Sequence, residues 1–301
     1  MKLSVVVCTY QRYDALADCL LALRSKIQTA PADLYEVVVV DNTPASARRS
    51  SKQFKADKWT VCDELGLSNA RNAGIAVADG EIIAFIDDDA IAVPEWCQEV
   101  IGAFDRNPDA VAVGGKVVPQ YPNDRCPSWM TPKLSEYLSC IDWGDREHVL
   151  RSGEWIVGAN MAYRRSVFEG DNLFDPGLGR KGNLGLMSNE EIAVIRRIGR
   201  ERIVYSPKML VRHVIADSRL NQTWFRKRVF WQAISDQLAG VDVPPIDSVW
   251  KEFRSLVPRL PAERRNLLGL AAECGNAEEF SVQLRQLHLI ALLLADGMAQ
   301  A

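Results

Sequence analysis

Ile82-Ile83-Ala84-Phe85-Ile86-Asp87-Asp88-Asp89 joins an apolar run of five residues to three consecutive aspartates. The run has the length and composition of a buried strand, and the acids mark its end. Three adjacent carboxylates repel one another, so at the end of an apolar strand they need a cation. Mg²⁺ and Mn²⁺ prefer oxygen ligands and often bridge carboxylates and substrate phosphates. The stretch therefore predicts a divalent metal site, with a solvated acidic turn as the alternative.

Strand and helix patterns alternate around this stretch. Apolar, β-branched runs at 3–8 and 36–40 predict buried strands, as does 82–86. Between the first two, apolar residues recur at helical spacing over 16–23. This alternation predicts βαβ units, and hence an α/β fold with a mostly parallel twisted sheet flanked by helices.

Polar residues follow three of the expected strands. Thr9, Asp41 and the Asp87–Asp89 run each come directly after an apolar run. Ligands of parallel sheets bind beyond the carboxyl ends of the strands, so these residues are expected to meet at one edge. Neither GxGxxG nor GxxxxGK[ST] follows the first strand. Any bound phosphate would therefore be held by metal and arginine instead of a glycine-rich loop.

The chain is expected to divide at about residue 220. The regular alternation fills 1–115, and a less regular half, rich in Pro and Trp, fills 116–220. Together they form the predicted α/β domain, 1–220. From 221 to 301 the pattern is helical, and proline pairs mark the helix boundaries. We expect a nucleotide-binding half, an acceptor-binding half and a helical C-terminal region.

Composition narrows the class of protein. The formal net charge of −3 argues against nucleic acid as a partner. Seven scattered cysteines without a CxxC pair argue against a disulfide framework or a zinc site. Neither a secretion signal nor a membrane-spanning apolar run is visible, so a cytoplasmic location is expected.

Seven short stretches occur in an order and spacing shared with a known enzyme family. They are Ser4–Arg12, Glu36–Asn42, Gly66–Gly74, Phe85–Asp89, Gly158–Arg165, Asn189–Glu191 and Pro207–His213. In this order they resemble the family 2 glycosyltransferases, whose catalytic domain has the GT-A fold. The resemblance covers roughly residues 1–230. It implies a GT-A catalytic domain at 1–220 with a helical C-terminal extension.

The resemblance implies one set of contacts with a nucleotide-sugar. Thr9 and Asp41 would lie at the base, where the Asp41 carboxylate accepts a base N–H. Arg71 would face the diphosphate or the ribose, because a guanidinium suits bidentate contact with phosphate. A turn role for Asp41 and a surface ion pair for Arg71 are the alternatives. The implied set is Thr9, Arg12, Asp41, Arg71, Asp87 and Asp88.

The resemblance also implies a metal site. Asp89 would be the principal ligand, Asp87 a second and His213 a third, while Asp87 or Asp88 contacts ribose or metal-bound water. Mn²⁺ or Mg²⁺ there would neutralise charge on the departing nucleoside diphosphate. A structural role is the alternative for His213. Removing Asp89 is expected to relieve repulsion, so folding stability should hold or rise.

Glu190 and Glu191 correspond to the family's pair of acids before a helix. Glu191 would be the base that deprotonates the acceptor hydroxyl, and Glu190 would raise its basicity or orient it. The commoner second acid is Asp, and the extra methylene of Glu moves the carboxylate by roughly 1.5 Å. Either glutamate could therefore be the base. The alternative is that both acids occur there only because the helix dipole favours negative charge in the first turn of a helix.

The acceptor side is implied by fewer residues. Trp155, Asn160 and the loop 174–186 would shape it, with contributions from the Trp129 and Trp143 region. Five glycines between Gly170 and Gly185 predict a loop that closes over the donor, with tight turns in a rigid loop as the alternative.

Basic and aromatic residues mix over 219–232. They could lie on an anionic membrane surface, where lipid-linked acceptors are found. The alternative is a helix that packs its aromatic residues on the domain and leaves its basic residues in solvent.

The implied activity is an inverting transfer from a nucleotide-diphospho-sugar, with a UDP- or dTDP-sugar favoured, to a glycan or lipid-linked acceptor. Such a role suits polysaccharide biosynthesis at the inner membrane face. A sugar-1-phosphate nucleotidyltransferase and a catalytically silent nucleotide-sugar-binding module are the alternatives. The sequence leaves the sugar, the acceptor and the oligomeric state open.

Overall fold

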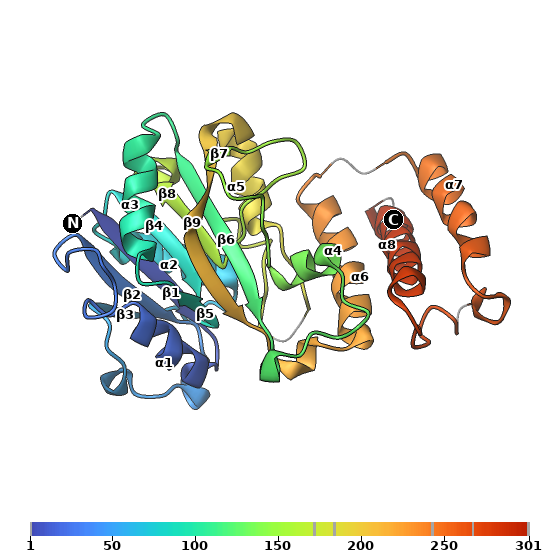
Figure 1. The fold of residues 1–301 in the computed structure, drawn as a ribbon, viewed down its shortest axis with the longest axis horizontal. Helices are drawn as coiled ribbons and strands as arrows, with labels where there is room; N and C mark the ends of the chain where they lie inside the picture. The colour runs from blue at the N-terminus through green and yellow to red at the C-terminus, as the bar shows by residue number, and fades with distance from the viewer. Residues whose placement is uncertain (1, 171–172, 183–184, 242–243, 267, 300–301) are drawn as a thin grey trace.

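The computed structural model describes residues 2–170, 173–182, 185–241, 244–266 and 268–299 (Figure 1). The first half, 1–115, which is the expected nucleotide-binding half, contains β1 (Leu3–Thr9), α1 (Tyr13–Ala22), β2 (Tyr35–Asp41), β3 (Lys58–Val61), α2 (Leu67–Val77), β4 (Ile82–Asp87), β5 (Ala90–Ala92) and α3 (Trp96–Arg106). The next half contains β6 (Ala112–Gln120), α4 (Pro132–Ser135), β7 (His148–Val149), β8 (Asn160–Arg164), α5 (Glu190–Ile198) and β9 (Ile203–Val214). The C-terminal helices are α6 (Gln222–Leu238), α7 (Ile246–Leu256) and α8 (Ala277–Ala299).

One sheet runs through both halves. Its order is β3-β2-β1-β4-β8-β6-β9-β5, with β7 beside β9. The first four strands are parallel, and β6 is parallel to β9. Strand β8 runs antiparallel to both β4 and β6, and β5 runs antiparallel to β9. The predicted α/β fold is confirmed, and its parallel character is strongest in the nucleotide-binding half.

Strand register gathers the predicted site at one edge. Thr9 pairs with Asp41 across β1 and β2, and Cys8 pairs with Asp87 across β1 and β4. In the second half, His213 on β9 pairs with Ala90, the residue directly after the aspartates. Segments separated by more than a hundred residues therefore end together, beyond the carboxyl ends of the parallel strands.

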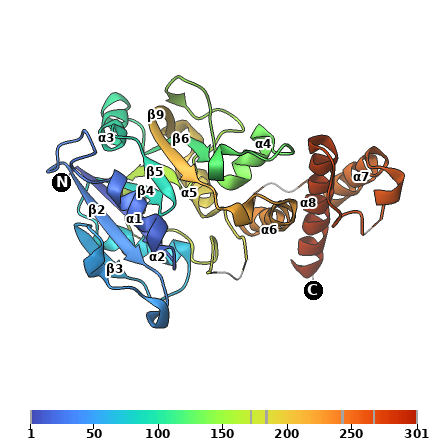
Figure 2. The same cartoon turned by 60° about the horizontal axis from the view of Figure 1, so that its bottom comes forward.

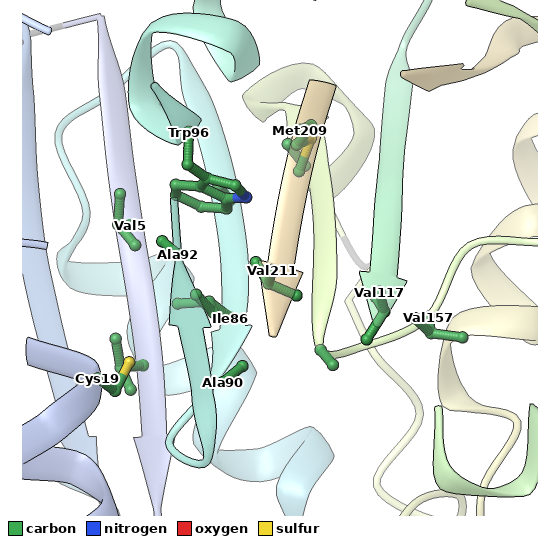
Figure 3. Close-up of a cluster of buried hydrophobic side chains, with 14 of the residues drawn as sticks. Val5, Cys19, Ile86, Ala90, Ala92, Trp96, Val117, Val157, Met209 and Val211 are labelled. Carbon is green, nitrogen blue, oxygen red and sulfur yellow. The ribbon is translucent and has the colours of Figure 1, made fainter. Parts of the chain in front are cut away.

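Helices cover both faces of the sheet because its strands are apolar on both sides. Val5 and Val7 of β1 point to the face covered by α1 and α3, and Val6 points to the face covered by α2 and α5. On the first face Trp96 of α3 lies over β4 and β5 in the apolar cluster drawn in Figure 3. On the second, Gly74 of α2 lets the helix approach closely, since a Cβ there would lie 2.4 Å from Val6.

The C-terminal helices stack outward from the catalytic half, with α8 between α6 and α7 in both views (Figures 1 and 2). Phe225 and Val229 of α6 belong to the main core cluster, together with Phe280 of α8. Arg226 and Arg228 are buried as well. The aromatic residues of α6 thus pack within the protein, so a membrane contact through this helix is not supported. The alternative interpretation, a helix that leaves its basic residues in solvent, is wrong for Arg226 and Arg228, because both are buried.

No helix in the described part of the chain is long and apolar enough to cross a membrane.

Asn160 does not have the role predicted from the sequence. It is fully buried at the start of β8, and Trp96 Nε1 donates to its Oδ1 over 2.9 Å. Its Nδ2 donates to the carbonyl oxygens of Lys116 and Met209 over 3.0 and 2.7 Å. The amide joins β8 to α3, β6 and β9, both of its N–H groups are used and it is fully buried, so we correct this assignment.

We predict that Asn160→Ala lowers the free energy of unfolding by roughly 3 kcal/mol or more. Three buried partners would lose their hydrogen bonds, and each loss costs about 1–3 kcal/mol. Urea unfolding would measure the change. A variant that unfolds like the wild type but has a raised KM for the acceptor would instead restore the original assignment.

Candidate active site

The three aspartates at the end of β4 point in different directions. Asp88 is fully buried, and its Oδ2 accepts a hydrogen bond of 2.7 Å from the Thr9 hydroxyl. Arg12 spans Asp88 and Asp89, with an ion pair of 2.5 Å to Asp88 Oδ1. Asp87 is more exposed and turns toward Arg71 and His213. Burial raises the pKa of Asp88, and Arg12 partly offsets that effect.

Asp87, Asp89 and His213 form a plausible metal site. One ligand atom of each lies within 4.8 Å of the others. His213 Nδ1 lies 2.7 Å from the carbonyl oxygen of Leu138, and Nε2 lies 3.0 Å from Asp89 Oδ1. Both partners are acceptors, so each ring nitrogen donates. Although burial opposes the charged form, Asp89 raises the pKa of His213 to about 10. A bound metal would replace the proton on Nε2, while Nδ1 would keep its bond to the carbonyl, as is typical of metal-binding histidines. Two carboxylates and one imidazole suit Mn²⁺ or Mg²⁺.

Asp89 is held by cations from three segments. Besides Arg12 and His213, Arg219 Nη2 lies 3.5 Å from its Oδ2. Although burial opposes ionisation, His213 and Arg12 keep the pKa of Asp89 well below its usual range. These contacts favour the opposite of the expected gain on removing Asp89, because attraction to the cations opposes repulsion among the carboxylates.

Glu190 and Glu191 begin α5, directly after Asn189, which has a left-handed backbone (φ 76°). Arg71 Nη1 donates to Glu190 Oε1 over 2.7 Å, and its Nη2 lies 3.9 Å from Asp87 Oδ1. Glu191 has no such partner among the described residues, and its Oε2 is buried without a hydrogen bond. Burial, and then repulsion from Glu190, raise the pKa of Glu191 to about 8.

Arg71 joins the metal-binding side to the glutamates, and its predicted contact with the diphosphate or ribose stays a prediction. Its side chain is 2% exposed and lies over the rings of Phe85 and Phe174. Gly158 leaves room for it, because a Cβ there would lie 2.1 Å from Arg71 Nη2. Contact with phosphate would require Arg71 to exchange one of these carboxylates.

Helix α6 holds the turn before the glutamates. Ser188 N donates to Ser235 Oγ over 3.1 Å, and Asn189 Nδ2 donates to Asp236 Oδ1 over 2.7 Å. Gln232 Nε2 donates to Asn189 Oδ1 over 2.9 Å. These bonds fix the left-handed Asn189 and hence the direction in which α5 starts.

A cavity of about 300 Å³ opens beside Thr9 and Arg12, at the ends of β1 and β2. Arg180 and Arg219, which sequence reasoning missed, contribute to its wall. Burial, and then Arg219, Arg228 and Arg12, lower the pKa of Arg180 to about 10. The other residues that line the cavity are Cys8, Tyr10, Gln11, Asn42, Leu67, Ala70 and Gly182.

Asp41 lies behind this cavity. It is fully buried, its Oδ2 accepts from the Tyr13 hydroxyl over 2.8 Å, and its Oδ1 accepts from Thr43 N over 3.0 Å. A base could reach the carboxylate only if a neighbour moved. Its predicted contact with a base stays a prediction.

The glycine-rich segment is described except for residues 171–172 and 183–184, which are outside the described residues. Its described part packs against the start of α2. Leu67 N donates to the carbonyl of Arg180 over 2.9 Å, and Ser68 Oγ donates to that of Leu178 over 3.0 Å. Helix α2 begins after Gly66, so Ser68 lies within its first turn. A Cβ on Gly179 would lie 3.2 Å from Glu190 Oε2. Closure of this segment over a donor stays a prediction.

The predicted acceptor tryptophans differ in environment. Trp155 is half-buried, with its ring 5.0 Å from that of Trp143 and Lys133 5.6 Å above it. Trp129 packs against Phe225 and Phe280 and belongs to the core. Trp155 and Trp143 thus remain candidates for an acceptor surface.

Comparison with known proteins identifies relatives with the same catalytic domain. Residues 4–170 match the family described as Glycosyl transferase family 2. A glucosyl-dolichyl phosphate glucuronosyltransferase of Haloferax volcanii is 31% identical over 256 residues, which span 81% of this chain and 79% of that protein. The succinoglycan biosynthesis protein ExoM of Rhizobium meliloti is 24% identical over 76% of this chain and 72% of its own length.

Two solved structures share the fold. The mannosyltransferase PcManGT from Pyrobaculum calidifontis, in complex with GDP-Man and Mn²⁺, has a TM-score of 0.59 at 17% identity and aligns over 100% of this chain and 88% of its own. A TarS structure from S. aureus in complex with UDP has a TM-score of 0.51 at 15% identity and aligns over 100% and 92%. At these identities the likeness establishes the fold alone.

We predict that Asp89→Asn lowers the free energy of unfolding by roughly 3–5 kcal/mol in metal-free buffer, because it leaves the buried His213 without its anion and weakens the contacts of Arg12 and Arg219. Asp87→Asn is the matched control: Asp87 is 28% exposed and has a single ion pair at 3.9 Å, so a loss below about 1 kcal/mol is expected. Guanidinium unfolding in EDTA would measure both. Equal losses, or a gain for Asp89→Asn, would contradict this account.

Proposed function

Because the chain belongs to glycosyl transferase family 2, we propose that this glycosyltransferase uses its nucleotide-sugar donor in a single, metal-assisted displacement that inverts the anomeric carbon. The observation that carries the proposal is the position of Arg71 between Asp87 and Glu190. One guanidinium spans the metal-binding carboxylates and the candidate base. Donor phosphates and acceptor hydroxyl would therefore meet within a few ångströms.

Asp87, Asp89 and His213 would hold Mn²⁺ or Mg²⁺. When bound, the ion would neutralise the charge that grows on the departing nucleoside diphosphate. Arg12, Arg180 and Arg219 surround the adjoining cavity and would contact the diphosphate. Thr9 and Asp41 are proposed for the base, with Asp41 reached after a movement of its neighbours. Asp88 would act indirectly, by holding Thr9 and Arg12 in position.

Glu191 is the proposed base. It would take the proton of the acceptor hydroxyl as that oxygen bonds to the anomeric carbon and the bond from that carbon to the phosphate oxygen breaks. A carboxylate with a pKa of about 8 is a far stronger base than an exposed glutamate. Glu190 is paired with Arg71, which makes it the weaker candidate and leaves it a role in raising the basicity of Glu191.

A lipid-linked saccharide phosphate is the proposed acceptor, on the strength of the Haloferax volcanii relative, whose name describes transfer to glucosyl-dolichyl phosphate. Trp155 and Trp143 would line the acceptor path. A peripheral location at the inner membrane face is retained as a proposal, because such acceptors lie at a membrane. The preference for a UDP- or dTDP-sugar also remains a proposal, since the two solved neighbours hold GDP-Man and UDP. The alternatives of a nucleotidyltransferase and a silent module lose their basis with the family assignment.

Metal removal tests the first part of this mechanism. We predict that excess EDTA abolishes sugar transfer and that Mn²⁺ or Mg²⁺ restores it. His213→Ala should weaken Mn²⁺ binding, measured calorimetrically, by at least about tenfold. Full turnover in excess EDTA would contradict a catalytic role for the metal, whatever the measured affinity for Mn²⁺.

Substitution of the two glutamates tests the base. Glu191→Gln should leave donor affinity near that of the wild type and lower kcat by roughly 10²–10⁴-fold. Glu190→Gln should keep measurable turnover and move the ascending limb of the pH–rate profile to lower pH. The sign follows because loss of the Glu190 charge removes repulsion that raises the pKa of Glu191. If Glu190→Gln lost turnover and Glu191→Gln kept it, Glu190 would be the base. If both variants kept full turnover, neither glutamate would be the base.

A further inference from the structure

Arg228 of α6 is a buried cation that the mechanism above does not use. Its exposed fraction is 8%, and its Nε and Nη1 have no hydrogen-bond partner among the described residues. Nη2 donates to Ser188 Oγ over 3.3 Å, and the guanidinium lies 5.8 Å from the centroid of the Tyr137 ring. Within the described part of the chain it forms no ion pair with a carboxylate. Burial accordingly lowers its pKa.

Arg226, two residues earlier on the same helix, is buried to the same extent but is fully partnered. Its exposed fraction is 9%, and its Nε donates to Gln283 Oε1 over 3.0 Å. Its Nη2 donates to the carbonyl of Ala272 over 2.7 Å and lies 3.3 Å from Glu273 Oε1. Position on α6 therefore does not explain why Arg228 lacks an anion.

A buried charge without a partner destabilises the protein that carries it. Such a group is consistent with a site where a bound molecule supplies the missing charge. Glu191, Glu190 and Asp236 all act on Arg228, but none of them forms an ion pair with it within the described part of the chain. A bound molecule is therefore the candidate source of the missing anion.

The neighbours of Arg228 place it beside the glutamates and near the donor cavity, where its charge, after burial and Arg219, helps to lower the pKa of Arg180. Ser188 comes two residues before Glu190, and Tyr137 lies in the segment that also holds His213 through Leu138. Arg228 does not line the donor cavity, where Arg180 and Arg219 are found. The donor diphosphate thus has its own arginines, and Arg228 is left for a second anion beside Glu191.

We propose that Arg228 binds an oxyanion of the acceptor, a phosphate or carboxylate close to the hydroxyl that Glu191 deprotonates. The proposal rests on the proposed function and adds a basis for acceptor selection. A neutral acceptor would leave Arg228 buried and unpaired, whereas an anionic acceptor would complete its hydrogen bonds. Discrimination of this kind comes from the group that the wrong substrate leaves without a partner.

Melting temperatures test the binding site without any assay of transfer. Arg228→Met should melt at the wild-type temperature or above, because it removes an uncompensated charge. Arg226→Met is the matched control and should melt lower, since it breaks an ion pair and several hydrogen bonds. With the donor cavity saturated by UDP or GDP and Mg²⁺, inorganic phosphate should raise the melting temperature of the wild type and of Arg226→Met, but not of Arg228→Met.

Kinetics then identify the source of the anion. Short-chain alkyl glycosyl phosphates and the matching neutral alkyl glycosides would be compared as acceptors. The wild type should favour the phosphate, and Arg228→Met should reduce that preference in kcat/KM by at least about tenfold, the effect of one lost charged hydrogen bond. Affinity for the nucleoside diphosphate should change less than twofold.

Three outcomes would overturn the proposal. Loss of nucleotide affinity in Arg228→Met would assign Arg228 to the donor. A melting temperature as low as that of Arg226→Met, with the phosphate response kept, would make it structural. An unchanged acceptor preference would remove its role in selection. If no acceptor received sugar from the wild type, the proposed function would fail, while the phosphate response of the melting temperature would still report on the site.

Discussion

The buried carboxylate of Asp89 is the constraint on which the rest of the site depends. It lies two residues after the largely apolar strand β4, and it meets Arg12 from the segment after β1, His213 from β9 and Arg219 from the segment before α6. A single anion thus holds together segments separated by more than two hundred residues. The same carboxylate is a candidate metal ligand. Folding stability and metal binding therefore depend on one group.

Charge alternates across the site in a way that suits transfer between two anionic substrates. The metal-binding carboxylates face a wall formed by Arg12, Arg180 and Arg219, and on the other side Arg71 separates Asp87 from Glu190. Repulsion among the arginines falls when a diphosphate binds between them. The pKa values of Arg180 and Glu191 are shifted in opposite directions for the same reason, since burial disfavours the charged form of each.

The sequence allowed prediction of those features that depend on short-range pattern. Apolar runs and their acidic ends predicted the strands, and the motifs predicted which residues meet at the sheet edge. Roles that depend on distant partners could not be predicted. Asn160 is occupied by groups more than forty residues away, and Ser68 bonds to a carbonyl more than a hundred residues away. Arg180 and Arg228 carry no motif, and neither forms an ion pair with a carboxylate among the described residues, which no local pattern reveals.

The C-terminal helices also help to position the two candidate catalytic glutamates. Gln232, Ser235 and Asp236 of α6 hold the turn from which α5 starts, so the direction of Glu190 and Glu191 is set by a helix outside the predicted catalytic domain. Helix α6 is itself fixed on its far side, where Arg226 bonds to Gln283 and Phe225 packs near Phe280 of α8. A boundary at residue 220 separates two sequence patterns. It does not separate two independent structures, because residues after the boundary hold the turn that positions Glu190 and Glu191, which lie before it.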